Sequence, residues 1–374
     1  LNDVSTMVEI LTKLGRNVER DGHRIEISSG GVKNVIAAYD LVSTMRASIS
    51  VLGPLLARYG EAKVSFPGGC VIGPRPIDLH LKGLKALGAD IQIREGYIVA
   101  RAGRLRGSRI YLGGHFGSSV LATANIVMAS VLAEGETVIE NAACEPEIVD
   151  LAGFLAAMGA DIKGMGTPTI RVRGVAGLKG VKYSVIPDRI EAGTYMIAAV
   201  LTGGNLFLEN ARTEHNLALI DKLHECGGVV EERSGGVDVC RSGRRPRATD
   251  VTTLPYPGFP TDLQAQMMSL VSVSEGISVI TEKIYPERFI HISELNRMGA
   301  GIILEGSTAI IKGVKRLSGA PVMASDLRAS AALVLAGLVA EGRTEISRIY
   351  HLDRGYEHIE DKLNGAGAKI WRVN

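Results

Sequence analysis

The sequence predicts an α/β protein of two domains, each an inside-out α/β barrel in which βαβαββ-type units surround their own helices. The first observation is length, because 374 residues exceed one ordinary core and favour two domains of about 150 to 200 residues. The second is a repeat of about 70 residues, in which a helix-like run ends in an apolar residue and a glycine before a short strand. Six copies are predicted, marked by Gly15, Gly88, Gly159, Gly227, Gly299 and Gly367.

A second marker precedes the first within a unit. Residues 133–135, 274–276 and 340–342 each read small residue, Glu, Gly, and an alternating run follows. This pattern is typical of an apolar helix that ends at glycine and leads into a strand. Turns at Glu95-Gly96 and Glu305-Gly306 predict that the last two strands of a unit form a hairpin.

The repeat also predicts the domain boundary. Three units fall in residues 1–186 and three in 187–374, and a ligand is expected in the cleft between two such domains. Unit one begins inside its second helix, and unit six stops after a strand without its hairpin partner. We therefore expect that several tens of residues of the natural protein precede Leu1, and that part of this segment completes unit six.

Composition excludes several classes of protein. Hydrophobic residues make up 46% and charged residues 22% of the chain, which is close to the average of globular proteins. A net charge of +2 predicts no nucleic-acid partner, and apolar runs such as 329–340 are too short to span a bilayer. The start shows no secretory signal, and the four cysteines lack metal-ligand spacing. A cytoplasmic protein without metal or cofactor is predicted, and its oligomeric state stays open.

One stretch, residues 67–80, suits chemistry better than packing. Two glycines precede Cys70, and Arg75 lies between prolines. We expect Gly68 and Gly69 to take positive φ and let this loop move, while the prolines stiffen the part that carries Arg75. Taken alone, Cys70 is more typical of a small buried side chain.

This stretch resembles the active-site loop of the bacterial UDP-N-acetylglucosamine 1-carboxyvinyltransferases, a family of enolpyruvyl transferases, and the resemblance extends over nearly the whole chain. It implies the two-domain enolpyruvyl transferase-like fold. It also implies transfer of the carboxyvinyl group of phosphoenolpyruvate to the 3-hydroxyl of UDP-N-acetylglucosamine, with release of phosphate, in peptidoglycan precursor synthesis. Cys70 would be the general acid that protonates phosphoenolpyruvate, and Asp262 the base that takes the proton of the sugar hydroxyl; Arg354 is the third catalytic candidate.

The resemblance implies binding residues at matching positions. Guanidinium groups suit a ligand that carries phosphate and carboxylate, because arginine pairs with both in bidentate fashion. Arginines beside Cys70 would also depress the pKa of its thiol. The residues expected to bind phosphoenolpyruvate are Arg46, Cys70, Arg75, Arg328 and Arg354, with Arg288 as a supporting candidate. Those expected to bind UDP-N-acetylglucosamine are Arg46, Arg75, Pro76, Ile77, Asp78, Leu79, Ser119, Val120, Asp262 and Ile284.

Some positions carry a second interpretation. Asp262 follows Pro260-Thr261 and precedes an apolar run, which is also typical of a helix N-cap. Asp188, Arg189 and Glu191 match a family signature at the domain junction, where we expect hinge ion pairs. His80 is expected to hold loop structure.

The chain also departs from the family pattern. The family places a Lys-Asn pair before residue 1, and no lysine here matches it. The stretch 114–123 is longer, with Leu121 in place of a glycine. Two other functions stay open: a 5-enolpyruvylshikimate-3-phosphate synthase-like transferase, which shares the six-unit architecture, and an inactive binding protein on the same scaffold, favoured if the segment before residue 1 is absent in nature.

Overall fold

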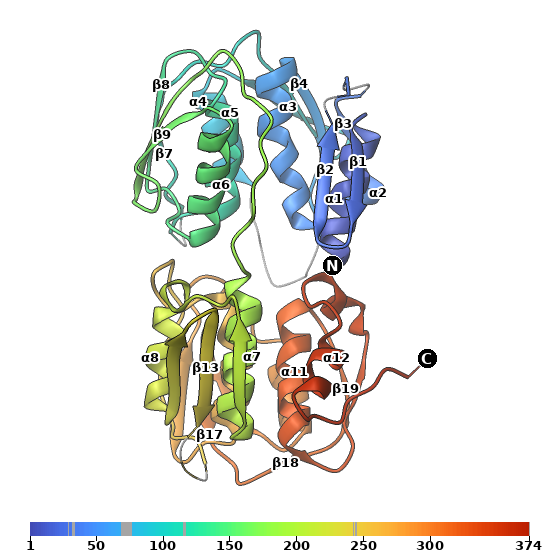
Figure 1. Ribbon diagram of the computed structural model, residues 1–374, viewed down its shortest axis with the longest axis vertical. Helices are drawn as coiled ribbons and strands as arrows, with labels where there is room; N and C mark the ends of the chain where they lie inside the picture. The colour runs from blue at the N-terminus through green and yellow to red at the C-terminus, as the bar shows by residue number, and fades with distance from the viewer. Residues whose placement is uncertain are drawn as a thin grey trace. The chain divides into compact units, whose positions relative to one another are not determined.

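The computed structural model describes residues 1–28, 30–31, 34–68, 77–114, 117–241, 243 and 245–373. The chain divides into two compact units (Figure 1). The described residues from 2 to 186 form the first lobe, and those from 187 to 373 the second lobe. Among the described helices, none combines the length and the apolar character that a membrane-crossing segment needs.

The repeated unit is visible as a sheet whose strand order recurs. In unit two, β3 (Ile36–Ala37) and β4 (Glu61–Ser65) are parallel, and the hairpin of β5 (Asp90–Arg94) and β6 (Tyr97–Arg101) adds to β4 in the order β3-β4-β6-β5. Units three and five repeat this order and these strand directions, which confirms the βαβαββ repeat. Their strands are β7 (Arg109–Tyr111), β8 (Glu136–Glu140), β9 (Asp161–Lys163) and β10 (Thr169–Arg173), and β14 (Val251–Thr252), β15 (Ile277–Thr281), β16 (Gly301–Glu305) and β17 (Thr308–Lys312).

Units one and four show part of this sheet. Unit one consists of helix α1 (Asn2–Lys13) and the hairpin of β1 (Asn17–Asp21) and β2 (Arg24–Ser28). Unit four has the strand order β11-β13-β12. Its elements are α7 (Arg189–Thr202), β11 (Asn205–Glu209), α8 (Leu217–Glu225), β12 (Gly228–Arg233) and β13 (Gly236–Arg241).

In unit six, the described residues form parallel strand pairs only. Strand β18 (Leu317–Ser318) pairs with β20 (Ala340–Glu341), and β19 (Pro321–Met323) with β21 (Glu345–Ser347). The strand expected near the C-terminus is wrong: the described residues 366–373 belong to no helix or strand. An antiparallel strand needs a neighbour for its backbone hydrogen bonds, and among the described residues no strand pairs with 366–373. The Asn364 side chain binds the backbone of Ile370 at 2.6 and 3.0 Å.

The marker glycines all end helices in the left-handed conformation. Their φ angles lie between 86° and 106°, a region that costs glycine little. The glycines of the second marker, Gly135, Gly276 and Gly342, also have positive φ. The six-unit pattern predicted from the sequence therefore has one conformational cause.

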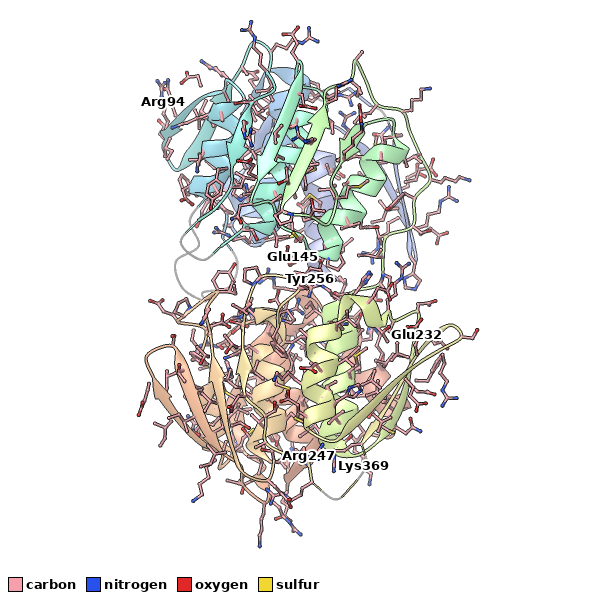
Figure 2. All side chains as sticks on the ribbon, turned by 90° about the vertical axis from the view of Figure 1, so that its left-hand side faces the viewer. Arg94, Glu145, Glu232, Arg247, Tyr256 and Lys369 are labelled. Atoms are coloured by element: carbon pink, nitrogen blue, oxygen red, sulfur yellow. The ribbon has the colours of Figure 1, made fainter. Side chains whose placement is uncertain are left out.

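In each lobe the most buried helices lie inside and the sheets outside, whereas helices such as α1 and α8 keep an exposed face. In the second lobe, α7, α9 (Gln264–Ser272) and α11 (Leu327–Val339) pack on one another, and every residue of α9 is buried. In the first lobe, α5 (Val120–Ser130) packs against α3 (Leu52–Tyr59) and α4 (Asp78–Ala86). Charged side chains such as Arg94 and Glu232 project outward from the hairpins (Figure 2). This is the inside-out α/β barrel that the sequence predicts.

Candidate active site

The predicted site residues share one place in the repeat. Each one that the structure describes follows a strand of a parallel pair, and in α/β sheets ligands bind beyond the carboxyl ends of such strands. In the first lobe, β3 is followed by Arg46, β4 by Ile77, Asp78 and Leu79, and β7 by Ser119 and Val120. In the second lobe, β14 is followed by Asp262, β15 by Ile284 and Arg288, β19 by Arg328, and β21 by Arg354. Cys70, Arg75 and Pro76 lie outside the described residues.

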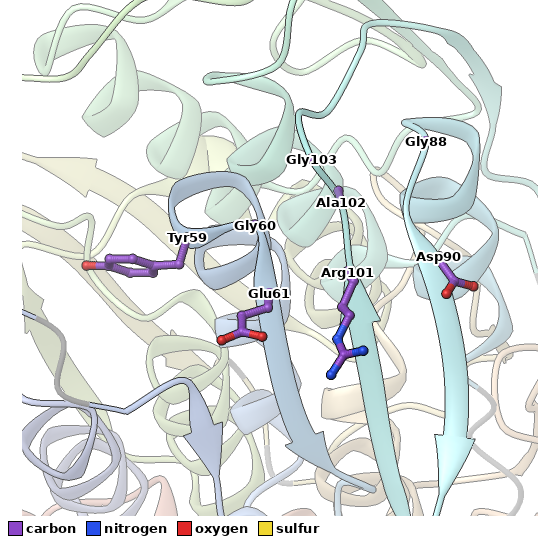
Figure 3. A pocket seen from close by; sticks show the side chains of 8 residues that line it. All are labelled: Tyr59, Gly60, Glu61, Gly88, Asp90, Arg101, Ala102 and Gly103. Carbon is purple, nitrogen blue, oxygen red and sulfur yellow. The ribbon is translucent and has the colours of Figure 1, made fainter.

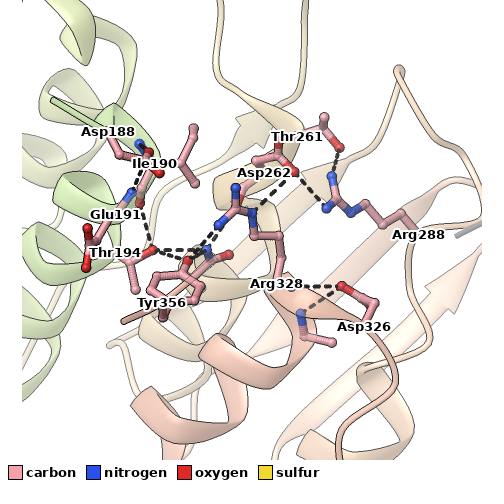
Figure 4. Close-up of polar contacts among 12 residues, drawn as sticks. Asp188, Ile190, Glu191, Thr194, Thr261, Asp262, Arg288, Asp326, Arg328 and Tyr356 are labelled. Carbon is pink, nitrogen blue, oxygen red and sulfur yellow. Dashed lines mark hydrogen bonds and ion pairs between the residues drawn. The ribbon is translucent and has the colours of Figure 1, made fainter. Parts of the chain in front are cut away.

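Asp262 is held by two buried guanidinium groups in the second lobe (Figure 4). Its Oδ1 accepts from Nη2 of Arg288 at 2.8 Å and from Nε of Arg328 at 3.5 Å. The Asp262 side chain is 44% exposed, whereas those of Arg288 and Arg328 are 7% and 12% exposed. The Asp262 carboxylate is therefore the most exposed of the three charged groups.

The N-cap interpretation of Asp262 is not supported. Asp262 lies within the short 3-10 helix η3 (Thr261–Leu263), whose N-cap is Pro260. Leu263 is the N-cap residue of the following α9. The aspartate is thus placed by its ion pairs with Arg288 and Arg328.

Both arginines stay cationic in spite of burial. Burial lowers the pKa of Arg288, but the carboxylates of Asp262 and Asp326 outweigh it, so that the pKa is raised overall. Burial also lowers the pKa of Arg328, and its interactions with Tyr356 and Asp262 more than restore it. A cation that keeps its charge in a buried position can orient an anion without titrating.

Arg328 is fixed by Tyr356, a residue that sequence reasoning missed. Nη1 of Arg328 donates to the Tyr356 hydroxyl at 3.2 Å, and the guanidinium lies 5.5 Å from the centre of the ring. The same hydroxyl is 2.8 Å from Oγ1 of Thr194 on α7 and 3.2 Å from Nε2 of Gln266 on α9. The position of Arg328 is therefore tied to the core helices of the lobe.

Asp326 also escaped prediction, although the sequence carries a signal for it. It precedes the apolar run of α11, and its Oδ1 accepts from the backbone N–H of Arg328 at 2.9 Å and of Ala329 at 3.1 Å. An aspartate immediately before an apolar helical run is the usual sign of an N-cap. This cap fixes the turn on which Arg328 lies.

Arg354 ends the 3-10 helix η4 (Ile349–Arg354) and is partly buried. The pKa of neighbouring His351 is lowered overall. Burial and the charge of Arg354 lower it, and the charge of Asp326 opposes them. His351 therefore lies within reach of both charges. Arg354 belongs to the part of the second lobe that also carries Asp326 and Arg328.

The hinge ion pairs expected for 188–191 stay a prediction, because the contacts described for Asp188 and Glu191 lie within the second lobe. Asp188 is instead the N-cap of α7, with Oδ1 accepting from the N–H of Ile190 at 2.7 Å and of Glu191 at 3.0 Å. Glu191 does form an ion pair, at 2.6 Å from Nζ of Lys362 on α12 (Ile359–Gly365), within the second lobe.

In the first lobe, Arg46 begins the 3-10 helix η1 (Arg46–Val51) and acts on His80. Burial and the charge of Arg46 lower the pKa of His80 to about 4, against an opposing effect of Asp78. His80 lies in helix α4 rather than in a loop, and its Nδ1 is 3.1 Å from Nδ2 of Asn125. Arg46 and the start of α4 are therefore neighbours.

The reason for glycine at position 68 differs from the prediction. Gly68 is not among the residues with positive φ. A Cβ there would lie 1.7 Å from the carbonyl oxygen of Ser43, so only glycine permits this approach. The N–H of Gly68 donates to the carbonyl of Val42 at 3.2 Å, which places the described start of the loop beside the segment that leads to Arg46.

Ser119 is the N-cap of α5. Its Oγ accepts from the N–H of Ala122 at 3.3 Å, and Val120 is the first helical residue. Leu79 lies against the turn before this cap, because a Cβ on Gly114 would be 3.2 Å from Cδ1 of Leu79. The two segments predicted to bind the nucleotide sugar are thus adjacent in the first lobe.

A depression of about 600 Å³ lies elsewhere in the first lobe (Figure 3). Glu61 and Asp90, the first residues of β4 and β5, line it together with Arg101, the last residue of β6. This is the opposite end of the sheet from the site residues, and none of them is among its described lining residues.

Comparison with known proteins agrees with this fold. The sequence model of the family described as EPSP synthase (3-phosphoshikimate 1-carboxyvinyltransferase) matches residues 1–363. UDP-N-acetylglucosamine 1-carboxyvinyltransferase 1 of Caldanaerobacter subterraneus subsp. tengcongensis is 57% identical over 372 residues, which are 100% of this chain and 88% of that protein. The UDP-N-acetylglucosamine 1-carboxyvinyltransferase of Geobacter metallireducens is 57% identical over 373 residues, with the same coverage.

Solved structures share the fold. The enolpyruvyl transferase NikO from Streptomyces tendae superposes with a TM-score of 0.87 at 23% identity, covering 98% of this chain and 86% of that one. EPSP synthase from Acinetobacter baumannii gives 0.73 at 21% identity, covering 98% and 87%. From the matches to the family model and to the full-length relatives, we conclude that this chain belongs to the EPSP synthase family of carboxyvinyl (enolpyruvyl) transferases, with relatives that are UDP-N-acetylglucosamine 1-carboxyvinyltransferases.

Proposed function

We propose that this chain transfers the carboxyvinyl group of phosphoenolpyruvate to the 3-hydroxyl of UDP-N-acetylglucosamine and releases inorganic phosphate. The observation that carries the proposal is 57% identity over the whole chain to relatives of that name. Shikimate 3-phosphate, the acceptor of the alternative, has support only from the broader family match. A cytoplasmic location in peptidoglycan precursor synthesis is part of the same proposal, and cell fractionation would test the location.

The proposed reaction is an addition followed by an elimination. Asp262 takes the proton of the sugar hydroxyl, whose oxygen attacks C2 of phosphoenolpyruvate, while Cys70 donates a proton to the methylene carbon. A tetrahedral phospholactoyl ketal results. Loss of a proton from the new methyl group then restores the double bond as the C2–O bond to phosphate breaks. The exposed Asp262 carboxylate, held by Arg288 and Arg328, supports the first step.

The arginines are proposed to bind the anionic groups of phosphoenolpyruvate. Arg46, Arg75, Arg328 and Arg354 are the candidates, since guanidinium pairs with phosphate and carboxylate and keeps its charge. Nucleotide-sugar contacts are proposed for Pro76, Ile77, Asp78, Leu79, Ser119, Val120 and Ile284.

The test of the acceptor is phosphate release by the intact protein. We expect release from phosphoenolpyruvate with UDP-N-acetylglucosamine and none with shikimate 3-phosphate. Release with shikimate 3-phosphate alone would select the alternative transferase, and release with neither would favour the inactive binding protein.

Replacing the proposed acid tests the mechanism. Cys70→Ser should lower kcat by about 10²- to 10⁴-fold, the usual contribution of a placed proton donor, and should affect binding of UDP-N-acetylglucosamine much less. Cys240→Ser on β13 is the matched control, because Cys240 is a free, partly buried thiol in the second lobe. Equal turnover in the two variants would contradict the role of Cys70.

A further inference from the structure

A buried carboxylate behind Asp262 has no place in the mechanism above. Glu282 directly follows β15 and is 0% exposed. Its Oε1 accepts from Oγ1 of Thr253 at 2.5 Å and from the backbone N–H of Ile284 and Tyr285 at 2.8 and 3.0 Å. Its Oε2 accepts from Oγ1 of Thr261 at 2.9 Å. A buried carboxylate is costly unless hydrogen-bonded, and four donors surround this one.

The position of Glu282 follows from the sheet. Strands β14 and β15 are parallel, so their carboxyl ends meet at the same edge. Thr253 directly follows β14 and Glu282 directly follows β15. The glutamate therefore lies between the segment that leads to Thr261 and Asp262 and the segment that carries Ile284 and Arg288.

Hydrogen-bond polarity makes this contact directional. A carboxylate offers acceptors, and both threonine hydroxyls donate their hydrogens to Glu282. Oγ1 of Thr261 is then left to accept from Nη1 of Arg288, at 3.0 Å. Nη2 of the same guanidinium donates to Oδ1 of Asp262 at 2.8 Å (Figure 4).

We propose that Glu282 is a positioning residue for the transfer reaction. Through Thr261 it fixes the rotation of the Arg288 guanidinium, and through Arg288 the direction in which Asp262 presents its carboxylate. Through two backbone N–H groups it also holds the turn of Ile284, a proposed sugar contact. This inference rests on the proposed role of Asp262 as the base that receives the sugar proton.

Glu282→Gln tests this polarity with almost no change of shape. If the amide oxygen faces the N–H groups of Ile284 and Tyr285, the amide NH₂ faces Thr261. The hydroxyl of Thr261 then loses the acceptor for its hydrogen and receives two donors, the glutamine and Arg288. If the amide is flipped, its NH₂ opposes two backbone donors. Either orientation disturbs the placement of Arg288 or the turn of Ile284.

The measurement is steady-state phosphate release with UDP-N-acetylglucosamine and phosphoenolpyruvate. We expect kcat of Glu282→Gln to fall by about ten- to a hundredfold, because small misplacements of a catalytic group have effects of that order. KM for phosphoenolpyruvate should stay near that of the wild type. Thr261→Val should show the same loss of kcat as Glu282→Gln. Thr261→Ser should keep the kcat of the wild type, since serine retains the hydroxyl.

Asn296→Ala is the matched control for stability. The Asn296 side chain binds the backbone of Ile302 at 2.9 and 3.1 Å in the same lobe. We expect this variant to unfold at lower temperature while keeping its kcat. A fall of kcat in proportion to the fall of Tm in all variants would show that Glu282 only supports the fold, and would overturn the inference.

The outcomes separate this inference from the proposed function. If the wild type is active and Glu282→Gln keeps its kcat, the inference fails and the function stands. If the wild type is inactive, the function fails, and a crystal structure of Glu282→Gln decides the inference: an unchanged Arg288–Asp262 contact overturns it, and a displaced guanidinium supports it. If Glu282→Gln does not fold, the two Thr261 variants decide, and equal kcat values for valine and serine overturn it.

Discussion

Units three and five have the same strand order and the same parallel pair, yet they end these strands differently. In unit three, β8 is followed by Asn141, in the left-handed conformation with φ 54°, and the helix after β7 is capped by Ser119. In unit five, the residue after β15 is the buried carboxylate Glu282, and it engages the hydroxyl of Thr261. One scaffold thus carries a helix cap in one unit and a charged network in another.

The difference shows where stability gives way to chemistry. In the described structure, α5 starts with a side-chain cap, whereas η3 and α9 start without one. A lost cap costs about 1 kcal/mol. The Thr261 hydroxyl at the start of η3 is instead shared between Glu282 and Arg288. We infer that unit five forgoes a helix cap in order to place Asp262.

The largest expected effect on turnover concerns the Asp262 carboxylate, which this network positions. Asp262→Asn should lower kcat by about 10²- to 10⁴-fold, since an amide cannot accept the sugar proton and a placed base contributes that much. Steady-state phosphate release measures it, with binding of UDP-N-acetylglucosamine measured by calorimetry to separate affinity from turnover. If Asp262→Asn turned over no more slowly than Ser119→Ala in unit three, the contrast between the two units would be broken.

The sequence predicts those features of the fold that depend on residues close together in the chain. The repeat and the hairpins depend on glycines with positive φ and on alternating runs, and both can be read within a few residues. The role of Gly68 depends on the distant carbonyl of Ser43, so the sequence shows a glycine but not its reason. Glu282 likewise gains its meaning from Thr253 and Thr261, which only the sheet brings beside it.

The site residues also divide into those that the sequence indicates and those that only the structure shows. Asp262 and the arginines were found by their match to a family pattern, and the structure adds that Arg288 and Arg328 both reach Asp262. Tyr356 had no local signal, because its hydroxyl contacts residues of three helices that are distant in the sequence. The expected C-terminal strand was wrong for a related reason: alternation predicts a strand, but only a paired neighbour makes one.

A smaller effect concerns the pH dependence of stability where helix α4 packs on helix α5. His80 is buried against Asn125 of α5, and its pKa of about 4 lies below the ordinary value of 6.5. As pH falls, the unfolded chain binds the proton first, so stability is complete above pH 6.5 and is lost between about 6.5 and 4. The loss is on the order of 3 kcal/mol.

Hydrogen exchange in peptides of α4 and α5, corrected for the intrinsic effect of pH, measures this loss. His80→Gln should remove it, because glutamine does not titrate and can still bond to Asn125. His291 in the second lobe, whose pKa burial also lowers to about 4, stays as an internal reference. Protection of α4 and α5 that declines equally in the wild type and in His80→Gln would exclude His80 as the cause.

The smallest effect separates the two roles of Ser119, the cap of α5 and a proposed contact of the nucleotide sugar. Ser119→Ala and Ser119→Gly both remove the hydroxyl, so both should raise KM for UDP-N-acetylglucosamine by the same factor, about fivefold for one hydrogen bond worth ~1 kcal/mol. Their stabilities should differ, since alanine at an N-cap costs about 1 kcal/mol and glycine only a few tenths. Urea unfolding and steady-state kinetics on the same preparations measure both. An unchanged KM in both variants, with the stability difference intact, would show that Ser119 only caps α5. Of the two positions compared, the one in unit five would then act in the reaction and the one in unit three would act only in stability.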